Sequence, residues 1–212
     1  MKRRKKTRAV INVLLAVFVG IAWLVMIFGN EGMLSSGGLS NLKYFTVLSN
    51  VFEGAASVVW LILNGRDVSD KGRRFAELLK YAACVCVGLT FVTVLVFLGP
   101  LYGYGNMFLH ANLFFHLIIP LMAMAEFVCF NRQRVGWREN LLAAAPTLLY
   151  GTVYLVNILI NGLGEPYQRD IYGFVTWGMP IGIGIFAVIC AVAFLIGLAL
   201  RALNRKLAGA KE

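Results

Sequence analysis

The chain has 212 residues, of which 59% are hydrophobic and 14% are charged, and its formal net charge is +10. A soluble domain carries about 25% charged residues, so this composition excludes an ordinary water-soluble domain. A membrane-spanning helix needs about 20 mostly apolar residues. Six such stretches occur, at residues 9–28, 42–63, 76–98, 108–130, 140–161 and 171–203. They predict an all-α bundle of six transmembrane helices that forms a single domain, 1–212.

The basic residues lie at alternate ends of these stretches. Four groups hold most of them: Lys2, Arg3, Arg4, Lys5, Lys6 and Arg8; Arg66, Lys71, Arg73 and Arg74; Arg132, Arg134 and Arg138; Arg201, Arg205, Lys206 and Lys211. The opposite loops hold only Lys43 and Arg169. Because positive charge favours the cytoplasmic side, both termini are predicted to be cytoplasmic. The net charge therefore indicates topology, and we expect no nucleic-acid partner.

The first ten residues, MKRRKKTRAV, resemble the basic start of a signal peptide. The apolar stretch that follows runs for about 20 residues, which is longer than the apolar region of a typical signal peptide. The sequence therefore predicts a first helix that is retained in the membrane.

The second stretch carries five polar residues at helical spacing. Thr46, Ser49, Asn50, Glu53 and Ser57 fall on one face of a helix. Such residues often join transmembrane helices through hydrogen bonds. A carboxyl near the middle of a span is also a candidate functional group, so Glu53 has two interpretations: a functional residue or a satisfied structural one.

The fourth stretch holds both histidines of the chain, His110 and His116. Pro120 follows His116 by four residues and has no N–H, so the carbonyl of His116 loses its normal helical donor. We expect the helix to open or kink at His116. A polar site there and a satisfied core histidine both fit the pattern.

A second polar stripe lies on the fifth stretch. It consists of Thr147, Tyr150, Tyr154, Asn157 and Asn161. Two stripes predict a polar interior between the second and fifth helices. Thr46, His116, Asn157 and Trp177 are expected at a common depth in the outer half of the membrane, where a hydroxyl, an imidazole and an amide could form a nucleophile, its base and an oxyanion donor.

The four cysteines, Cys84, Cys86, Cys129 and Cys190, all fall within predicted spans. Their spacing fits neither a disulfide framework nor a metal site. We interpret them as small apolar residues in helix packing, and we expect no metal and no cofactor.

Two short motifs resemble a known family. The second stretch contains LKYFTVLSN, with two aromatic residues before Thr46, and the fourth contains FFHLIIP, with His116 before Pro120. On a six-helix chain this pairing resembles the androgen-induced and androgen-dependent membrane hydrolases and their bacterial relatives. Animal members cleave fatty acid esters of hydroxy fatty acids. The resemblance implies that Thr46 is the nucleophile, that His116 is required, and that Ser49 and Asn50 follow a bacterial pattern.

Three functions remain open. The first is an intramembrane lipid esterase with Thr46 and His116 as catalytic residues, supported by Ser49, Asn50, Glu53, Tyr154, Asn157 and Trp177. Its partners would be a hydrophobic ester and membrane lipids, and its expected location is the bacterial cytoplasmic membrane. The second is a transporter or small-molecule binding protein in which Glu53 binds a proton or cation. The third is a structural or assembly protein of the membrane.

Overall fold

The computed structural model describes residues 2–28, 38–65, 68–164 and 169–209. Every regular element in these ranges is helical, and six helical segments are long and apolar enough to cross a membrane. The segments are Arg3–Phe28, Phe45–Asn64, Asp70–Tyr102, Ala111–Phe130, Trp137–Asn161 and Met179–Leu207. The predicted fold class and the predicted number of spans are therefore confirmed.

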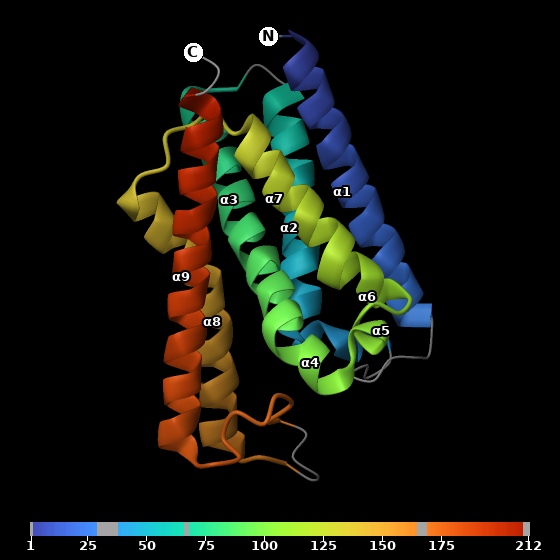
Figure 1. Cartoon of the computed structure of the whole chain (residues 1–212), viewed down its shortest axis with the longest axis vertical. Coiled ribbons are helices and arrows are strands. Elements are labelled where there is room, and N and C mark those ends of the chain that lie inside the picture. Colours follow the sequence, from blue (N-terminus) through green and yellow to red (C-terminus); the bar gives the residue numbers. More distant parts are fainter. Residues whose placement is uncertain (1, 29–37, 66–67, 165–168, 210–212) are drawn as a thin grey trace.

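The long helices alternate in direction, so both ends of the chain lie at one end of the bundle (Figure 1). They are α1 (Lys2–Phe28), α2 (Phe45–Gly65), α3 (Asp70–Thr93), α7 (Ile119–Phe130), α8 (Trp137–Asn161) and α9 (Met179–Gly209). We call the end that holds Lys2 and Gly209 the terminal end. Helix α3 lies at the centre because it contacts α2, α7, α8 and α9. Its residues from Lys80 to Thr90 are all buried.

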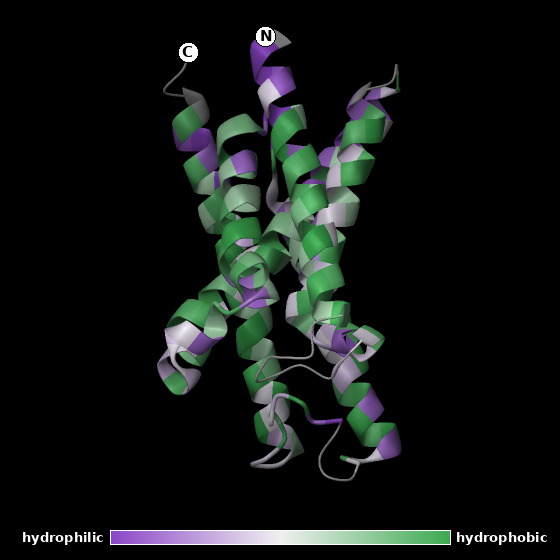
Figure 2. Ribbon diagram, turned by 90° about the vertical axis from the view of Figure 1, so that its right-hand side faces the viewer, coloured by the Kyte–Doolittle hydropathy of each residue, from purple (hydrophilic) through white to green (hydrophobic). Residues whose placement is uncertain are grey.

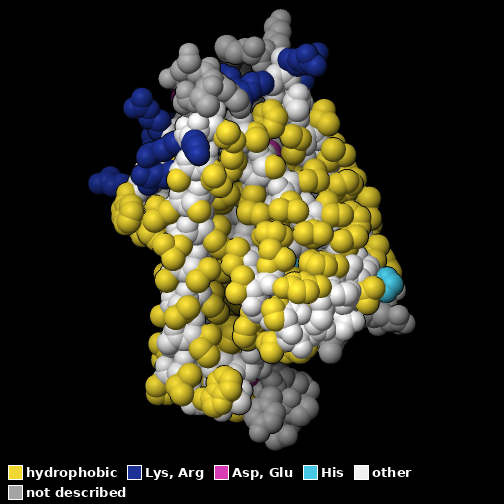
Figure 3. Space-filling model, viewed as in Figure 1, with side chains coloured by type: hydrophobic (Ala, Val, Ile, Leu, Met, Phe, Trp, Pro, Cys, Tyr) yellow, Lys and Arg dark blue, Asp and Glu magenta, His cyan; other side chains and the backbone are white. Residues whose placement is uncertain are grey.

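The outer surface suits a bilayer. Apolar residues dominate the middle of the bundle (Figure 2), and on the face seen in Figure 3 the Lys and Arg side chains gather near the terminal end. Large apolar side chains such as Leu149 and Ile160 are 67% and 75% exposed. Contact between this apolar surface and lipid is favourable, whereas its contact with water would be costly. The cytoplasmic position of the terminal end stays a prediction from the positive-inside rule.

Six short helical elements complete the described structure: η1 (Gly38–Lys43), η2 (Val94–Leu98), α4 (Gly99–Tyr102), α5 (Tyr104–Met107), α6 (Ala111–Leu113) and η3 (Phe114–Ile118). The span Asp70–Tyr102 consists of α3, η2 and α4, and the span Ala111–Phe130 consists of α6, η3 and α7.

Two prolines distort the helices in the same way. Pro100 follows η2 and Pro120 follows η3, and both η2 and η3 are π-helical. Since proline removes one donor from the ladder, the backbone bonds five residues back instead. The predicted opening of the helix at His116 is confirmed.

The predicted last span, 171–203, begins too early. Helix α9 starts at Met179, because Gly173 and Gly178 adopt φ values of +67° and +96°, which an α-helix excludes. Trp177 therefore lies in the segment that connects α8 and α9 and not in a spanning helix. The apolar composition of this segment explains the wrong prediction, but the positive φ values of its glycines are incompatible with a helix.

Candidate functional site

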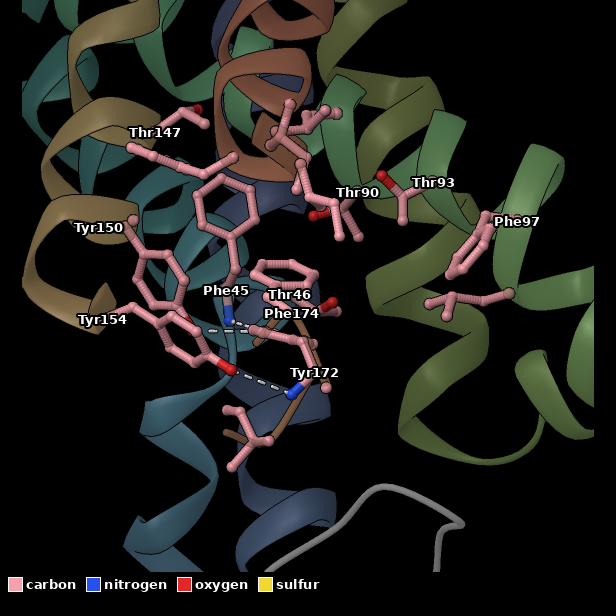
Figure 4. Close-up of a pocket in the computed structure, with 18 of the residues that line it drawn as sticks. Phe45, Thr46, Thr90, Thr93, Phe97, Thr147, Tyr150, Tyr154, Tyr172 and Phe174 are labelled. Atoms are coloured by element: carbon pink, nitrogen blue, oxygen red, sulfur yellow. Dashed lines mark hydrogen bonds between the residues drawn. The ribbon is translucent and has the colours of Figure 1, made fainter. Parts of the chain in front are cut away.

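A pocket of about 610 Å³ lies beside the start of α2. It is bounded by α2, α3 with η2, α8, α9 and the segment 171–177 (Figure 4). Most of its lining is apolar, and the side-chain hydroxyls come from Thr46, Thr90, Thr93, Thr147, Thr176, Tyr102, Tyr150, Tyr154 and Tyr172. Its described lining holds no charged side chain and no histidine. Such a pocket suits an uncharged, mostly apolar molecule with one or two hydrogen-bonding groups.

Thr46 occupies the second residue of α2 and is half-buried at the pocket. No hydrogen bond engages its hydroxyl within the described ranges. Its backbone carbonyl, in contrast, accepts bonds from Ser49 Oγ at 3.0 Å and from Asn50 Nδ2 at 2.7 Å. The backbone of Thr46 is therefore held in place while its hydroxyl remains available to a molecule in the pocket.

Tyrosines tie the connecting segment to the start of α2. The N–H of Phe45 donates to Tyr172 Oη at 2.7 Å, and Tyr150 Oη donates to the carbonyl of Lys43 at 2.6 Å. Burial raises the pKa of the Tyr172 phenol, so this group stays neutral in the folded protein. The two tyrosines anchor the backbone on both sides of Tyr44, in the segment that immediately precedes Thr46.

Asp170 fixes the shape of the same segment. Its carboxylate accepts the N–H groups of Phe174 and Val175 at 2.9 and 3.0 Å, and it accepts Tyr154 Oη at 2.5 Å. Asp170 therefore stabilises the turn formed by residues 170–175 and attaches it to α8 through Tyr154. Tyr172 is thereby held against the pocket (Figure 4).

His116 lies in η3 and is 6% exposed. Its Nδ1 is 2.6 Å from the carbonyl oxygen of Met107. Because a carbonyl can only accept, Nδ1 carries the proton and Nε2 is left as an acceptor. This is the tautomer that a general base requires. His116 does not line the pocket, and in the described structure no hydrogen bond joins it to Thr46.

Asn50 connects the two predicted motifs. Its Nδ2 donates to the carbonyl of Thr46 at 2.7 Å and to the carbonyl of Phe115 at 3.0 Å. Phe115 precedes His116 in the chain, so a single amide holds the backbone of α2 next to that of η3. The structure thus brings together the backbone segments that carry Thr46 and His116, although their side chains are not hydrogen-bonded.

The remaining predicted residues are divided between several places. Tyr154 lines the pocket, and Trp177 lines it while remaining 70% exposed. Ser49 Oγ is buried and lies 3.0 Å from Thr90 Oγ1 of α3. Asn157 is exposed, accepts a bond from Asn161 at 2.8 Å and is absent from the pocket lining.

The polar stripe of α2 contacts two different regions. Its first residue, Thr46, lies at the pocket with polar residues of α8, and most of its later residues contact α3. Thr46 shares the pocket with Thr147, Tyr150 and Tyr154, as the expected polar interior requires. Farther along α2, Glu53 is fully buried and pairs with Lys80 of α3. This second polar region continues to three further charged residues, Arg8, Glu77 and Glu126.

Sequence reasoning missed that Glu53 belongs to a group with these four other charged residues. From the sequence, Arg8 is interpreted as one of the topological charges before the first span, and no role is predicted for Lys80 or Glu126. One signal could have found them. Lys80 and Glu126 lie inside predicted spans, and charged groups in spans usually pair with one another.

No protein-family model, curated protein or solved structure matches this chain. Its function is therefore argued from its own residues and their geometry.

Proposed function

We propose that the protein is an intramembrane hydrolase of lipid esters, with Thr46 as nucleophile and His116 as general base. The observation that carries this proposal is the free hydroxyl of Thr46 in a mostly apolar pocket of about 610 Å³. That volume is within the range of roughly 300–1,000 Å³ that small-molecule sites occupy. The hydroxyl lies at the edge of a membrane span, where a lipid ester can reach it.

The lining supports a substrate with an acyl chain. The apolar lining includes Phe97 and Leu98 of η2 and Ile185, Phe186 and Ile189 of α9. The molecular surface is hollowed between α9 and the central helices (Figure 3). An acyl chain entering there would stay in contact with apolar groups along its length, which avoids the cost of exposing it to water.

The chemistry follows the usual order of a hydroxyl nucleophile. Thr46 Oγ attacks the ester carbonyl while its proton passes to Nε2 of His116. The tetrahedral intermediate then expels the alcohol, which takes this proton, and leaves the acyl group on Thr46. Water activated by the same imidazole hydrolyses the acyl-threonine and restores the hydroxyl.

His116 is the candidate base because the pocket lining itself supplies none. Its Nδ1 bond to Met107 gives the required tautomer. Asn50 holds the preceding residue, Phe115, against α2. Catalytic hydrogen bonds are often long in a free enzyme and tighten when the substrate binds. We therefore propose that substrate binding brings Nε2 to the hydroxyl of Thr46.

The resemblance to the androgen-induced and androgen-dependent membrane hydrolases is consistent with this assignment. It rests on LKYFTVLSN around Thr46 and FFHLIIP around His116. It extends the proposal to fatty acid esters of hydroxy fatty acids as the substrate class and to the bacterial cytoplasmic membrane as the location.

The test uses purified protein in detergent and a p-nitrophenyl ester of a fatty acid. Replacement of Thr46 by Ala should abolish hydrolysis and labelling by a fluorophosphonate probe, whereas Thr46→Ser should retain part of both. Thr93→Ala is the matched control, because Thr93 is another threonine of the same pocket. Full activity of Thr46→Ala, or equal losses in Thr46→Ala and Thr93→Ala, would refute the nucleophile.

The second candidate function is ion-coupled transport that uses Glu53. The observation in its favour is that Glu53 is fully buried and forms an ion pair with Lys80 inside the membrane region. Liposomes that contain the protein and a pH-sensitive dye would report proton flux driven by a membrane potential. Flux that Glu53→Gln abolishes, in a protein that cleaves no ester, would favour transport over hydrolysis.

A further inference from the structure

Five charged side chains meet where α1, α2, α3 and α7 cross. They are Arg8, Glu53, Glu77, Lys80 and Glu126, which we call the buried charge cluster. Glu53, Lys80 and Glu126 are at most 1% exposed, and Arg8 is 7% exposed. The cluster is separate from the pocket, because none of these residues is part of the pocket lining.

Arg8 uses its whole guanidinium in the cluster. Its two terminal nitrogens bind the carboxylate of Glu77 at 2.6 and 2.7 Å, and its Nε donates to Glu126 Oε1 at 2.5 Å. The ring of Trp60 lies 4.5 Å from the guanidinium carbon, and Trp60 Nε1 donates to Glu77. Asn12 adds a bond to Glu126 Oε1 at 3.2 Å. Each of the three guanidinium nitrogens of Arg8 therefore donates to Glu77 or Glu126, and in the described structure none of them bonds to Glu53.

Lys80 of α3 is hydrogen-bonded to two side chains of α2. Its ammonium donates to Glu53 Oε1 and to Ser57 Oγ. The second oxygen of Glu126 lies 3.9 Å from Lys80 Nζ, which is beyond hydrogen-bonding distance. Lys80 therefore neutralises Glu53 directly and leaves Glu126 Oε2 without a donor.

The formal charges of the cluster do not cancel. Three carboxylates, Glu53, Glu77 and Glu126, face two cations, Arg8 and Lys80, which leaves a net charge of −1. Cys84 of α3 also lies within electrostatic reach, but its thiol brings no positive charge. On α9, Arg201 interacts with Tyr81, and among the described residues no ion pair links it to these carboxylates. An unbalanced charge inside a membrane bundle is costly.

The hydrogen-bond inventory shows the same deficit. Three buried oxygens in or next to the cluster have no partner in the described structure: Asn12 Oδ1, Glu53 Oε2 and Glu126 Oε2. All three are acceptors when the carboxyls are ionised. The unpartnered buried donors of the described residues, Trp23 Nε1 and Arg201 NH1, belong to residues outside the cluster. An added proton on a carboxyl oxygen supplies both one positive charge and one donor.

We infer that the buried charge cluster binds one proton, held between Glu53 and Glu126 beside Lys80. A metal ion is a poorer ligand, because the ammonium of Lys80 already lies between these carboxyls and the described residues contain no group of His, Cys, Asp or Glu able to hold a metal. Glu77, whose side chain is 11% exposed, is the most exposed carboxylate of the cluster, and Glu53 and Glu126 lie deeper, with 0% of their side chains exposed. This site is independent of ester hydrolysis.

The experiment is infrared spectroscopy of the purified full chain at neutral pH in a maltoside detergent, which contains no ester carbonyl that would absorb in the same region. A protonated carboxyl gives a carbonyl stretching band that a carboxylate lacks. One such band is expected in the native protein, and Glu53→Gln and Glu126→Gln should each remove it, since either change brings the cluster to a net charge of zero. Glu139→Gln is the matched control, because Glu139 pairs with the exposed Arg74 outside the cluster.

The native protein alone can overturn the inference, so the result does not depend on whether the variants fold. Absence of the band from the native protein at neutral pH would refute it. Persistence of the band in both Glu53→Gln and Glu126→Gln would also refute it. Loss of the band when sodium replaces potassium in the buffer would instead identify a sodium site and equally overturn the proton assignment.

Discussion

The side-chain amide of Asn50 donates to the backbone carbonyl of Phe115 at 3.0 Å, across the interface between α2 and η3. The same nitrogen bonds to the carbonyl of Thr46 at 2.7 Å. The π-helical distortion before Pro120 leaves carbonyls in this region without their usual partners, and Asn50 supplies a donor from another helix. This contact positions the segment that carries His116 relative to the helix that carries Thr46.

Replacement of Asn50 by Ala should therefore weaken both the fold and the site. We expect a loss of about 1–2 kcal/mol, the scale of a buried interhelical hydrogen bond, together with slower ester hydrolysis. Thermal unfolding in detergent measures the first effect. Asn64→Ala is the control, because the hydrogen bond that Asn64 donates in the described structure goes to the carbonyl of Trp60 within the same helix. An Asn50 variant as stable as the Asn64 variant would contradict this role.

The topology can be tested with single cysteines on a cysteine-free background. A cysteine at Tyr104 should react with an impermeant thiol reagent added outside the cell, and a cysteine at Ser69 should not. Both positions are exposed and lie at opposite ends of the bundle. External labelling at Ser69 would place the terminal end outside the cytoplasm. The additional position at Ser36, on the same predicted outer side, lies outside the described residues.

Gly197 is predicted to be irreplaceable in the contact between α9, α3 and α8. A Cβ there would lie 2.5 Å from Asn140 Oδ1 and 2.9 Å from Tyr81 Oη, two buried groups that hydrogen-bond to each other. Gly197→Ala should cost about 1–3 kcal/mol, as overpacking usually does. Gly184→Ala on the same helix meets nothing within 4 Å and should be neutral or stabilising. Equal melting temperatures for the two variants would disprove the steric argument.

Tyr172 is expected to make the stability of the folded protein more sensitive to alkaline pH. Its pKa is raised by burial, so the folded state favours the protonated phenol. Stability from this group is fully present below the ordinary tyrosine pKa of about 10 and is lost as the pH rises toward the higher folded value. Tyr172→Phe should therefore lose less stability than the native protein between neutral and strongly alkaline pH. Melting temperatures measured across this range check the prediction, and parallel curves would contradict it.

Local spacing was enough to predict the spans and the polar face of α2. Ser49, Asn50, Glu53 and Ser57 are all buried, as a single helical face with polar contacts requires. Pro120 was enough to predict the distortion at His116, because the missing N–H is a local property. These features depend on residues a few positions apart.

The rest depends on how the helices pair, which spacing does not give. In the sequence, Arg8 is indistinguishable from the other basic residues that indicate topology. Only the placement of α1 relative to α3 and α7 reveals its ion pairs with Glu77 and Glu126. The apolar neighbours of Trp177 predict a helix at this position. The structure has no helix there, because Gly173 and Gly178 adopt positive φ values. The pocket likewise arises where the segment 171–177 returns to the start of α2.

The role of His116 is the most direct test of the proposed chemistry. If its Nε2 accepts the proton of Thr46, His116→Ala should lower kcat by about 100-fold or more, the scale of general base catalysis. KM should change little, because His116 does not line the pocket. His110→Ala is the matched control, since His110 is exposed near the opposite end from the termini. Removal of the 2.6 Å bond to Met107 could also unfold η3, so each variant's melting temperature is measured first. A folded His116→Ala protein that cleaves the ester as fast as His110→Ala would leave Thr46 without this base and make His116 a structural residue that anchors Met107.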